Sequence, residues 1–302
     1  MLTLPFLVAA TLAPYSVPTP MTEPVVFADG VVSTGDFETH PAFTPDGRTL
    51  YFVKSTPKFT DWKIYVSRFA DGRWSKPEIA PFSGKYRDAD PYVTADGKSL
   101  YFISDRPVGD RPKQDMDIWV MTKKGAGWGE PRNLGAPVNS DGSEWLPRLA
   151  ANGTLYFGSD RPGGLGGTDL YRARREGKGF GKPENLGPVI NSDVDEYEPC
   201  IAPDESFLVF MAAGRQDDTG GGDLYISYRK DGAWTPPKNL GPTINRRGLD
   251  IGPYLSLDGK YFFFSSARKD GEFTPTDRPN RSKNGLADIY QMDLDALHGL
   301  VK

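Results

Sequence analysis

The sequence contains few of the residues that most often carry out chemistry in proteins. Its 302 residues include one cysteine, Cys200, and two histidines, His40 and His298. A single thiol cannot form an internal disulfide, and no group of Cys and His residues has the spacing of a metal site. We therefore expect no metal and no cofactor, and we expect Cys200, which follows a proline in an apolar stretch, to be buried and unreactive.

A large excess of one charge is also absent. The chain carries 36 Lys and Arg residues against 40 Asp and Glu residues, and its formal net charge is −4. A slightly acidic chain has no overall electrostatic attraction for nucleic acid. Nucleic acid is therefore not an expected partner.

Long hydrophobic runs are absent except at the N-terminus. The first twenty residues, MLTLPFLVAATLAPYSVPTP, include an apolar run that is shorter than the ~20 residues of a membrane span but suits the core of a signal peptide. We expect residues 1–20 to be a signal peptide or a disordered segment, residues 21–302 to form one folded domain, and no membrane span. A periplasmic or secreted location is the matching expectation, with a cytoplasmic location as the alternative.

Glycine-rich stretches are present, but they do not match a phosphate-binding motif. Residues 159–171, SDRPGGLGGTDLY, lack both the P-loop pattern and G-x-G-x-x-G, and the chain contains neither G-x-S-x-G nor H-E-x-x-H. Related stretches begin at residues 104, 212 and 265. A motif with several near-copies along the chain indicates a repeated structural connection.

The glycine-rich stretches belong to a longer repeat that occurs five times. Each copy has a proline, an apolar strand, an Asp-Gly-type turn, a second strand, a connecting stretch and a third strand beginning near Asp. The connecting stretch is of the glycine-rich kind in the last four copies, and an aromatic strand follows in the first four. The prolines that begin the copies are Pro41, Pro91, Pro147, Pro199 and Pro253. Four hairpin-linked strands in a unit of roughly 50 residues are typical of a β-propeller blade.

We therefore expect an all-β fold, a single β-propeller of four-stranded antiparallel blades. Five blades are favoured, with six as the alternative. The fifth copy lacks its fourth strand, because the chain ends shortly after DIYQMDLDAL. We expect residues 23 to about 34 to supply that strand, which would close the ring and leave no open sheet edge.

The repeats PxxxxDGxxLYFxSxR, GGxDLY and WxxPxNLGxxxN resemble the WD40-like (PD40) repeats of the TolB-type β-propeller family. They are similar to propeller modules of bacterial cell-envelope proteins, and the resemblance covers about residues 36–292. It implies a non-enzymatic binding scaffold in the cell envelope with a protein or a glycan as partner. TolB itself has six blades.

Two kinds of charged residue recur in the repeats. An acid lies three positions before each repeat proline, and in four copies an arginine follows the second strand. The acids are Glu38, Asp88, Glu144, Glu196 and Asp250, and the arginines are Arg106, Arg161, Arg215 and Arg268. We expect internal carboxylate–guanidinium pairs that join neighbouring loops, whereas the alternative is a ring of acids that binds a metal or protonates a sugar. The first copy, KSTPKFTDW, has Lys54 and Thr56 and no arginine, so Glu38 is expected to lack this partner.

Ligand binding is expected where the copies differ. The non-repeated side chains between the repeat acids and the prolines are His40, Asp90, Trp145, Tyr197 and Glu198. We expect them around the mouth of the central channel, with Arg268 as a further binding residue. Aromatic rings beside carboxylates suit a sugar or a peptide, and ordinary loop packing is the alternative. The fifth copy also has an insertion that we expect to form a basic flap, built from Lys269, Arg278, Arg281 and Lys283, with Arg246 and Arg247 nearby.

An enzyme is the alternative to a binding scaffold. Some five-bladed propellers hydrolyse glycosidic bonds with a pair of carboxylic acids. Asp90 and Glu198 are the candidates for such a pair, because the repeat assigns neither of them a partner.

Overall fold

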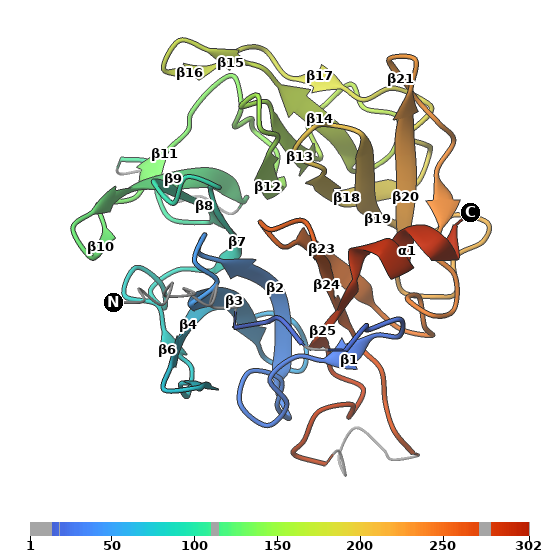
Figure 1. Ribbon diagram of the computed structural model, residues 1–302. Helices are drawn as coiled ribbons and strands as arrows, with labels where there is room; N and C mark the ends of the chain where they lie inside the picture. Colours follow the sequence, from blue (N-terminus) through green and yellow to red (C-terminus); the bar gives the residue numbers. More distant parts are fainter. Residues whose placement is uncertain (1–13, 18, 110–114, 272–278, 302) are drawn as a thin grey trace, which may run out of the picture.

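Five antiparallel sheets are arranged around a common axis in the computed structural model, which describes residues 14–17, 19–109, 115–271 and 279–301 (Figure 1). Each innermost strand has an acid of the repeat as its first or second residue. They are β2 (Phe37–Phe43), β7 (Asp88–Val93), β12 (Glu144–Leu149), β18 (Asp195–Ile201) and β23 (Asp250–Leu255). The five-bladed propeller predicted from the repeats is confirmed.

Each blade continues outward in the order of the chain. The second strands are β3 (Thr49–Ser55), β8 (Ser99–Ser104), β13 (Leu155–Ser159), β19 (Phe207–Ala213) and β24 (Tyr261–Ser266). The third strands are β4 (Lys63–Ala70), β9 (Asp117–Lys124), β14 (Asp169–Ala173), β20 (Asp223–Lys230) and β25 (Asp288–Asp293). The outermost strands are β6 (Glu78–Ile79), β11 (Arg132–Asn133), β17 (Glu184–Asn185), β22 (Lys238–Asn239) and β1 (Val25–Val26).

A few short elements complete the fold. Two-residue strands extend four of the blades: β5 (Arg73–Trp74), β10 (Gly127–Trp128), the pair β15 (Arg175–Glu176) and β16 (Gly179–Phe180), and β21 (Ala233–Trp234). The helix α1 (Leu294–Leu300) follows β25. In the part of the chain that the structure describes, no helix has both the length and the apolar character needed to cross a bilayer.

The N-terminal strand closes the ring. In β1, Val25 pairs with Gln291 and Val26 pairs with Tyr290 of β25, so the first strand of the chain is the outer strand of blade 5. The preceding residues also contact this blade, because the Met21 N–H donates to the Asp293 carboxylate at 2.8 Å. Closure by a strand from residues 23–34 is therefore confirmed.

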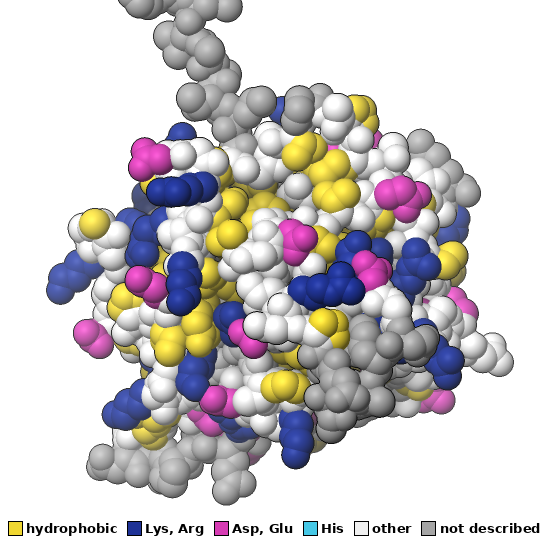
Figure 2. All heavy atoms as spheres, turned by 90° about the horizontal axis from the view of Figure 1, so that it is seen from below, with side chains coloured by type: hydrophobic (Ala, Val, Ile, Leu, Met, Phe, Trp, Pro, Cys, Tyr) yellow, Lys and Arg dark blue, Asp and Glu magenta, His cyan; other side chains and the backbone are white. Residues whose placement is uncertain are grey.

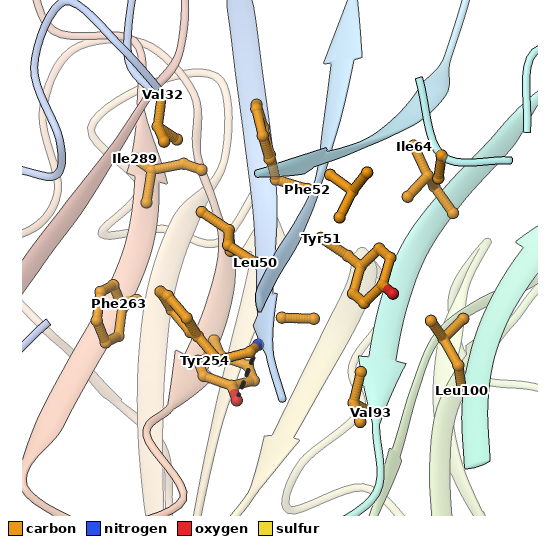
Figure 3. Packing of buried hydrophobic residues seen from close by; sticks show 14 of the residues in the cluster. Val32, Leu50, Tyr51, Phe52, Ile64, Val93, Leu100, Tyr254, Phe263 and Ile289 are labelled. Atoms are coloured by element: carbon orange, nitrogen blue, oxygen red, sulfur yellow. Dashed lines mark hydrogen bonds between the residues drawn. The ribbon is translucent and has the colours of Figure 1, made fainter. Parts of the chain in front are cut away.

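The core lies between neighbouring blades. Figure 3 shows Leu50 and Phe52 of β3 beside Tyr254 and Phe263 of blade 5, and the Tyr254 hydroxyl accepts a hydrogen bond from a backbone N–H, that of Phe43, at 3.3 Å. These side chains are buried. Burial of both faces of every sheet explains why single blades need their neighbours.

The innermost strands share a bulge next to the repeat proline. In β2 the pairing with β3 jumps from Thr39 to Ala42, and the same interruption occurs in the other four innermost strands. The residue before each proline has a positive φ, between 40° and 63°; these residues are His40, Asp90, Leu146, Glu198 and Gly252. A bulge redirects a side chain and is common beside functional sites.

The strand pairings also determine which loops share a face. Phe37 pairs with Ser55, and Lys54 pairs with Lys63, so the loop before each innermost strand lies on the same side as the loop between the second and third strands. We call this side the upper face. On the outer side seen in Figure 2, Lys, Arg, Asp and Glu side chains are interspersed with apolar ones.

Candidate functional site at the channel mouth

Three of the bulge residues meet at the axis of the propeller. The His40 Nε2 atom lies 2.9 Å from Oε1 of Glu198 and 3.4 Å from Oδ1 of Asp90. These side chains come from blades 1, 4 and 2, and all three are at least 88% buried, because the side chain of Glu198 is 12% exposed and the other two are less exposed. We call this group the channel triad.

Backbone groups hold the channel triad in place. The second oxygen of Asp90 accepts the N–H of Leu146 at 2.9 Å, and that of Glu198 accepts the N–H of Gly252 at 2.6 Å. Each carboxylate therefore joins its own blade to the next one. On the other side of the imidazole, His40 Nδ1 lies 2.8 Å from the Thr39 hydroxyl.

The protonation of the channel triad follows from burial and from the neighbouring charges. Burial lowers the pKa of His40, but the carboxylates of Glu198 and Asp90 outweigh it, so the pKa is raised overall. Burial raises the pKa of Asp90, and the charge of His40 opposes this rise. The geometry therefore favours an imidazolium that lies between two carboxyl groups.

A second layer of side chains lies two residues further along the innermost strands. Arg148 is 3% exposed, its guanidinium lies 5.3 Å from the ring centre of Tyr92 and 5.9 Å from that of Tyr254, and it donates to the Pro147 carbonyl at 3.0 Å. Its positive charge acts on Asp90 and on His40. Arg148 thus supplies a second positive charge to Asp90, in addition to that of His40.

Cys200 lies in this second layer. It is buried, as the sequence predicted, and burial raises its thiol pKa to about 11 although Arg148 opposes the rise. A thiol with such a pKa carries little thiolate at neutral pH, which makes it a poor nucleophile.

A row of aromatic rings lies on the upper face beside the channel. Neighbouring ring centres along the row are 4.8 Å apart for Phe37 and Phe59, 5.2 Å for Phe59 and Trp62, 6.1 Å for Trp62 and Trp145, and 6.4 Å for Trp145 and Tyr197. All except Phe37 are only partly buried. We call these five residues the aromatic row, and it runs across blades 1, 3 and 4.

The repeat acids are buried and most are paired. Arg106 lies 2.6 Å from Asp88, Arg161 lies 3.1 Å from Glu144, and Arg215 lies 2.7 Å from Glu196; each acid is 0% exposed. These are the carboxylate–guanidinium pairs expected in blades 2, 3 and 4.

The expectation that Glu38 lacks a partner is wrong. The Lys54 ammonium lies 3.1 Å from Glu38, and Thr34 donates to the same carboxylate through its backbone N–H at 3.1 Å. The register explains the contact, because Glu38 and Lys54 are directly opposite each other in the pairing of β2 with β3. Lys54 has the register of Ser104 in blade 2, and Thr56 stands where Arg106 does, so the cation that pairs with the acid comes from two residues earlier in blade 1.

Arg268 is separate from the channel triad. Its guanidinium donates to the carbonyls of Thr243 and Ile244 at 2.8 and 2.7 Å, and it packs against the rings of Phe264 and Tyr290. It therefore belongs to the boundary between blades 4 and 5. The basic flap residue Arg278 lies outside the described residues.

The predictions from the sequence did not include several residues of the site. Arg148, Phe59 and Trp62 are in none of the predicted sets, although the structure places them beside residues that are. Arg148 is a charged residue in an otherwise apolar strand segment, LPRLA. A charged residue in such a segment is a sequence signal for a buried charge that neutralises other buried charges or takes part in function. Phe59 and Trp62 lie in a loop whose path the repeat alone does not define.

The site has no arrangement typical of a metal centre. Among the residues that the structure describes, no group of three or more His, Cys, Asp or Glu side chains is placed to hold a metal ion. The channel triad can bind and orient polar groups or exchange a proton between His40 and a carboxylate.

Comparisons with known proteins find similar folds. A solved glycoside hydrolase is 11% identical, with a TM-score of 0.60 over 90% of this chain and 92% of that one. The α-L-arabinanase of Penicillium chrysogenum, complexed with arabinobiose, is 14% identical, with a TM-score of 0.52 over 90% and 99%. A candidate TolB from Agrobacterium tumefaciens is 15% identical, with a TM-score of 0.42 over 86% and 91%.

The likeness is in the fold. No family model and no curated protein matches the sequence. The two structures with TM-scores above 0.5 support the propeller fold, and at these identities they do not transfer an activity. The chemistry must be argued from the channel triad and the aromatic row.

Proposed function

We propose that the protein binds a carbohydrate on its upper face, across the mouth of the channel. The observation that carries the proposal is the aromatic row beside the channel triad. Sugar rings present C–H faces that pack on aromatic rings and hydroxyls that bond to charged groups. A row of partly buried rings next to buried carboxylates and an imidazole offers both kinds of contact.

Trp145 is the centre of this binding surface. Its ring lies between those of Trp62 and Tyr197, and its indole Nε1 is buried with no hydrogen-bond partner among the described residues. A buried donor without a partner costs free energy, and a ligand hydroxyl could satisfy it. Trp145 therefore both packs against and donates to the proposed ligand.

Hydrolysis of a glycosidic bond is the second candidate. Asp90 and Glu198 both contact one nitrogen of His40, so two carboxyl groups lie close together at the axis, as such hydrolysis requires. Solved propellers with TM-scores above 0.5 also include enzymes that act on carbohydrates. Binding remains the better supported function, because both oxygens of each carboxylate already accept a contact from this chain.

The experiment is a calorimetric titration with a panel of neutral and acidic oligosaccharides. We expect one class of sugar to bind to the wild-type protein and Trp145→Ala to weaken that binding about tenfold or more. Trp234→Ala is the matched control, since Trp234 lies in β21 beside Arg229, in the outer part of blade 4. Absence of binding by every sugar, or equal losses in both variants, would contradict the proposal.

The same panel separates binding from hydrolysis. Release of reducing ends by the wild type, lost in both Asp90→Asn and Glu198→Gln, would establish the enzyme. Binding without release would leave a scaffold for glycan recognition. The extracytoplasmic location predicted from residues 1–20 is part of this proposal, and fractionation of cells that express the full chain tests it.

A further inference from the structure

A second hollow lies away from the channel, at the boundary of blades 4 and 5. Its volume is about 830 Å³, and it lies beside the segment that leads into β1. The residues that line it are Pro24, Arg246, Arg247, Gly248, Ala267, Arg268, Lys269, Asp270, Lys283, Asn284, Gly285 and Tyr290. We call it the blade-5 pocket, and its volume is in the range typical of small-molecule sites.

The blade-5 pocket is strongly cationic in a protein whose net charge is negative. Among the described residues, five Lys and Arg side chains line it against one carboxylate, that of Asp270. Asp270 lies 3.6 Å from the Lys283 ammonium, a long ion pair between half-exposed groups. Arg246 and Arg247 are exposed, and no carboxylate among the described residues lies within ion-pair distance of either.

Arg268 marks the point where blade 5 departs from the repeat. In blades 2, 3 and 4 the corresponding arginine forms an ion pair with the repeat acid. Each of these arginines also donates to one or two backbone carbonyls. Arg268 keeps two such contacts, but among the described residues no ion pair joins it to the repeat acid Asp250. Burial lowers the pKa of Arg268, the charge of Asp250 opposes this, and the positive charge of Arg246 adds to the lowering. Both guanidinium groups line the same pocket.

Tyr290 gives a second, independent indication of a ligand. It lines the blade-5 pocket and is 1% exposed, and its hydroxyl has no hydrogen-bond partner among the described residues. At the same position of blade 4, the Tyr225 hydroxyl donates to the Asp217 carboxylate at 2.8 Å. Blade 5 thus keeps the tyrosine donor without the carboxylate acceptor that satisfies it in blade 4.

We propose that the blade-5 pocket binds an oxyanion, a carboxylate or phosphate group of a small ligand. Guanidinium groups bind such anions through paired, charge-assisted hydrogen bonds. An oxygen of the anion would take the place that Asp217 has in blade 4 and accept the Tyr290 hydroxyl. The negative charge would also relieve the repulsion between Arg246 and Arg268. This site is distinct from the channel triad and does not depend on carbohydrate binding there.

The experiment is a calorimetric titration of the full chain with two probes. Trigalacturonate supplies carboxylates on a sugar, and inorganic pyrophosphate supplies phosphates without one. We expect at least one probe to bind, with an affinity that falls as salt is added. Binding of trigalacturonate alone would identify an acidic sugar as the source of the anion, and binding of pyrophosphate alone would identify a phosphate compound.

Variants locate the binding. Arg246→Glu together with Arg247→Glu should weaken it about a hundredfold, since each lost charged contact costs about tenfold or more. Arg73→Glu is the matched control, because Arg73 is an exposed arginine of β5, in blade 1. Tyr290→Phe should weaken binding about three- to tenfold while raising the melting temperature of the unliganded protein, since the unpaired buried hydroxyl is removed.

Three results would overturn the proposal. These are the absence of heat with both probes at millimolar concentration, equal losses in the Arg246/Arg247 variant and in Arg73→Glu, and unchanged affinity in Tyr290→Phe. Because Arg246 and Arg247 are exposed, their replacement leaves the core intact. Failure here would leave the channel-mouth proposal unaffected, since the neutral sugars of that test carry no oxyanion.

Discussion

At the scale of single residues, the channel triad is a compact set of opposed charges in the middle of the propeller. His40 contacts both Asp90 and Glu198, so it compensates two buried carboxyl groups at once. A buried ion pair adds little net stability, but removal of one partner lowers the free energy of unfolding strongly, because the remaining charge is then buried without a partner. The stability of this region therefore depends on His40.

His40→Ala should lower the free energy of unfolding by about 3–5 kcal/mol. The reason is that Asp90 and Glu198 would be left buried and close to each other without a positive group between them. Urea denaturation at pH 6 measures the change. The triple variant with Asp90→Asn and Glu198→Gln should recover most of the loss, and a loss that persists in the triple variant would show that His40 acts through packing instead.

Several buried carboxyl groups predict how stability depends on pH. Burial is the main cause that raises the pKa of Asp250 to about 6, of Glu144 to about 7 and of Asp288 to about 8. The pKa of His40 is also raised. In the folded protein each of these groups therefore keeps its proton up to a higher pH than it does in the unfolded chain, where carboxyl groups have a pKa near 4 and histidine has one of about 6.5.

The free energy of unfolding should therefore fall as the pH rises from about 5 to about 8, because the unfolded state binds fewer protons than the folded state across this interval. Melting temperatures measured at several pH values test the slope. Asp288→Asn should make the slope shallower, since it removes the group with the highest pKa of the three. A melting temperature that rises over this interval would contradict the assignment.

At the scale of elements, the glycine-rich connections are held by close approach of backbones. A Cβ built on Gly166 would lie 1.8 Å from the Val194 carbonyl oxygen, so no side chain fits there. The same loop bonds to Asp169, whose carboxylate accepts the N–H groups of Leu165 and Gly166 at 2.7 and 3.0 Å. The loop is therefore a packed joint between blades 3 and 4.

Gly166→Ala should destabilise the protein by about 1–3 kcal/mol, as expected when a methyl group is forced into a filled space. Gly127→Ala is the matched control, because a Cβ on Gly127 meets no atom within 4 Å. Thermal unfolding of both variants measures the difference. Equal melting temperatures would mean that the loop moves freely to admit the methyl group.

The bulge is the second feature at this scale. Gly252 is the glycine among the five bulge residues, and a Cβ there would lie 3.1 Å from the backbone nitrogen of His40. This close approach brings blade 5 against the His40 backbone, while the Gly252 N–H bonds to Glu198. The five innermost strands have the same bulge, but each has a different amino acid at the residue before the proline, so the site at the axis is not symmetric.

At the scale of the whole molecule, the ring depends on the segment before blade 1. Tyr15 is 4% exposed and its ring lies 5.0 Å from that of Phe43 and 5.8 Å from that of Phe263. Further along, β1 supplies the outer strand of blade 5. The two ends of the propeller are therefore joined both by strand pairing and by buried aromatic rings.

Truncation tests this closure. A chain that begins at Met21 should be less stable than one that begins at Pro14 by about 3 kcal/mol, since it lacks the buried Tyr15 ring. A chain that begins at Ala28 should lose more, because it also lacks β1. Urea denaturation of the three chains gives the order, and equal stability of the first two would show that Tyr15 contributes little.

The sequence by itself determined the fold and its regular contacts. The repeat prolines, the Asp-Gly turns and the acid and arginine of each copy are local patterns, and strand pairing within a blade follows from their spacing. The pairs Asp88–Arg106 and Glu196–Arg215 follow as well, because both partners lie in one copy. Closure by residues 23–34 could be predicted because the last copy lacks a strand.

Only the tertiary structure decided which unlike residues meet. His40, Asp90 and Glu198 were predicted at the channel mouth one by one, but their contacts join blades 1, 2 and 4, and those distances depend on the size of the ring and on the bulge. The roles of Arg148, Trp62 and the blade-5 pocket depend in the same way on neighbours from other blades. Spacing along the chain fixes contacts inside a repeat, whereas contacts between repeats exist only once the sheets close around a common axis.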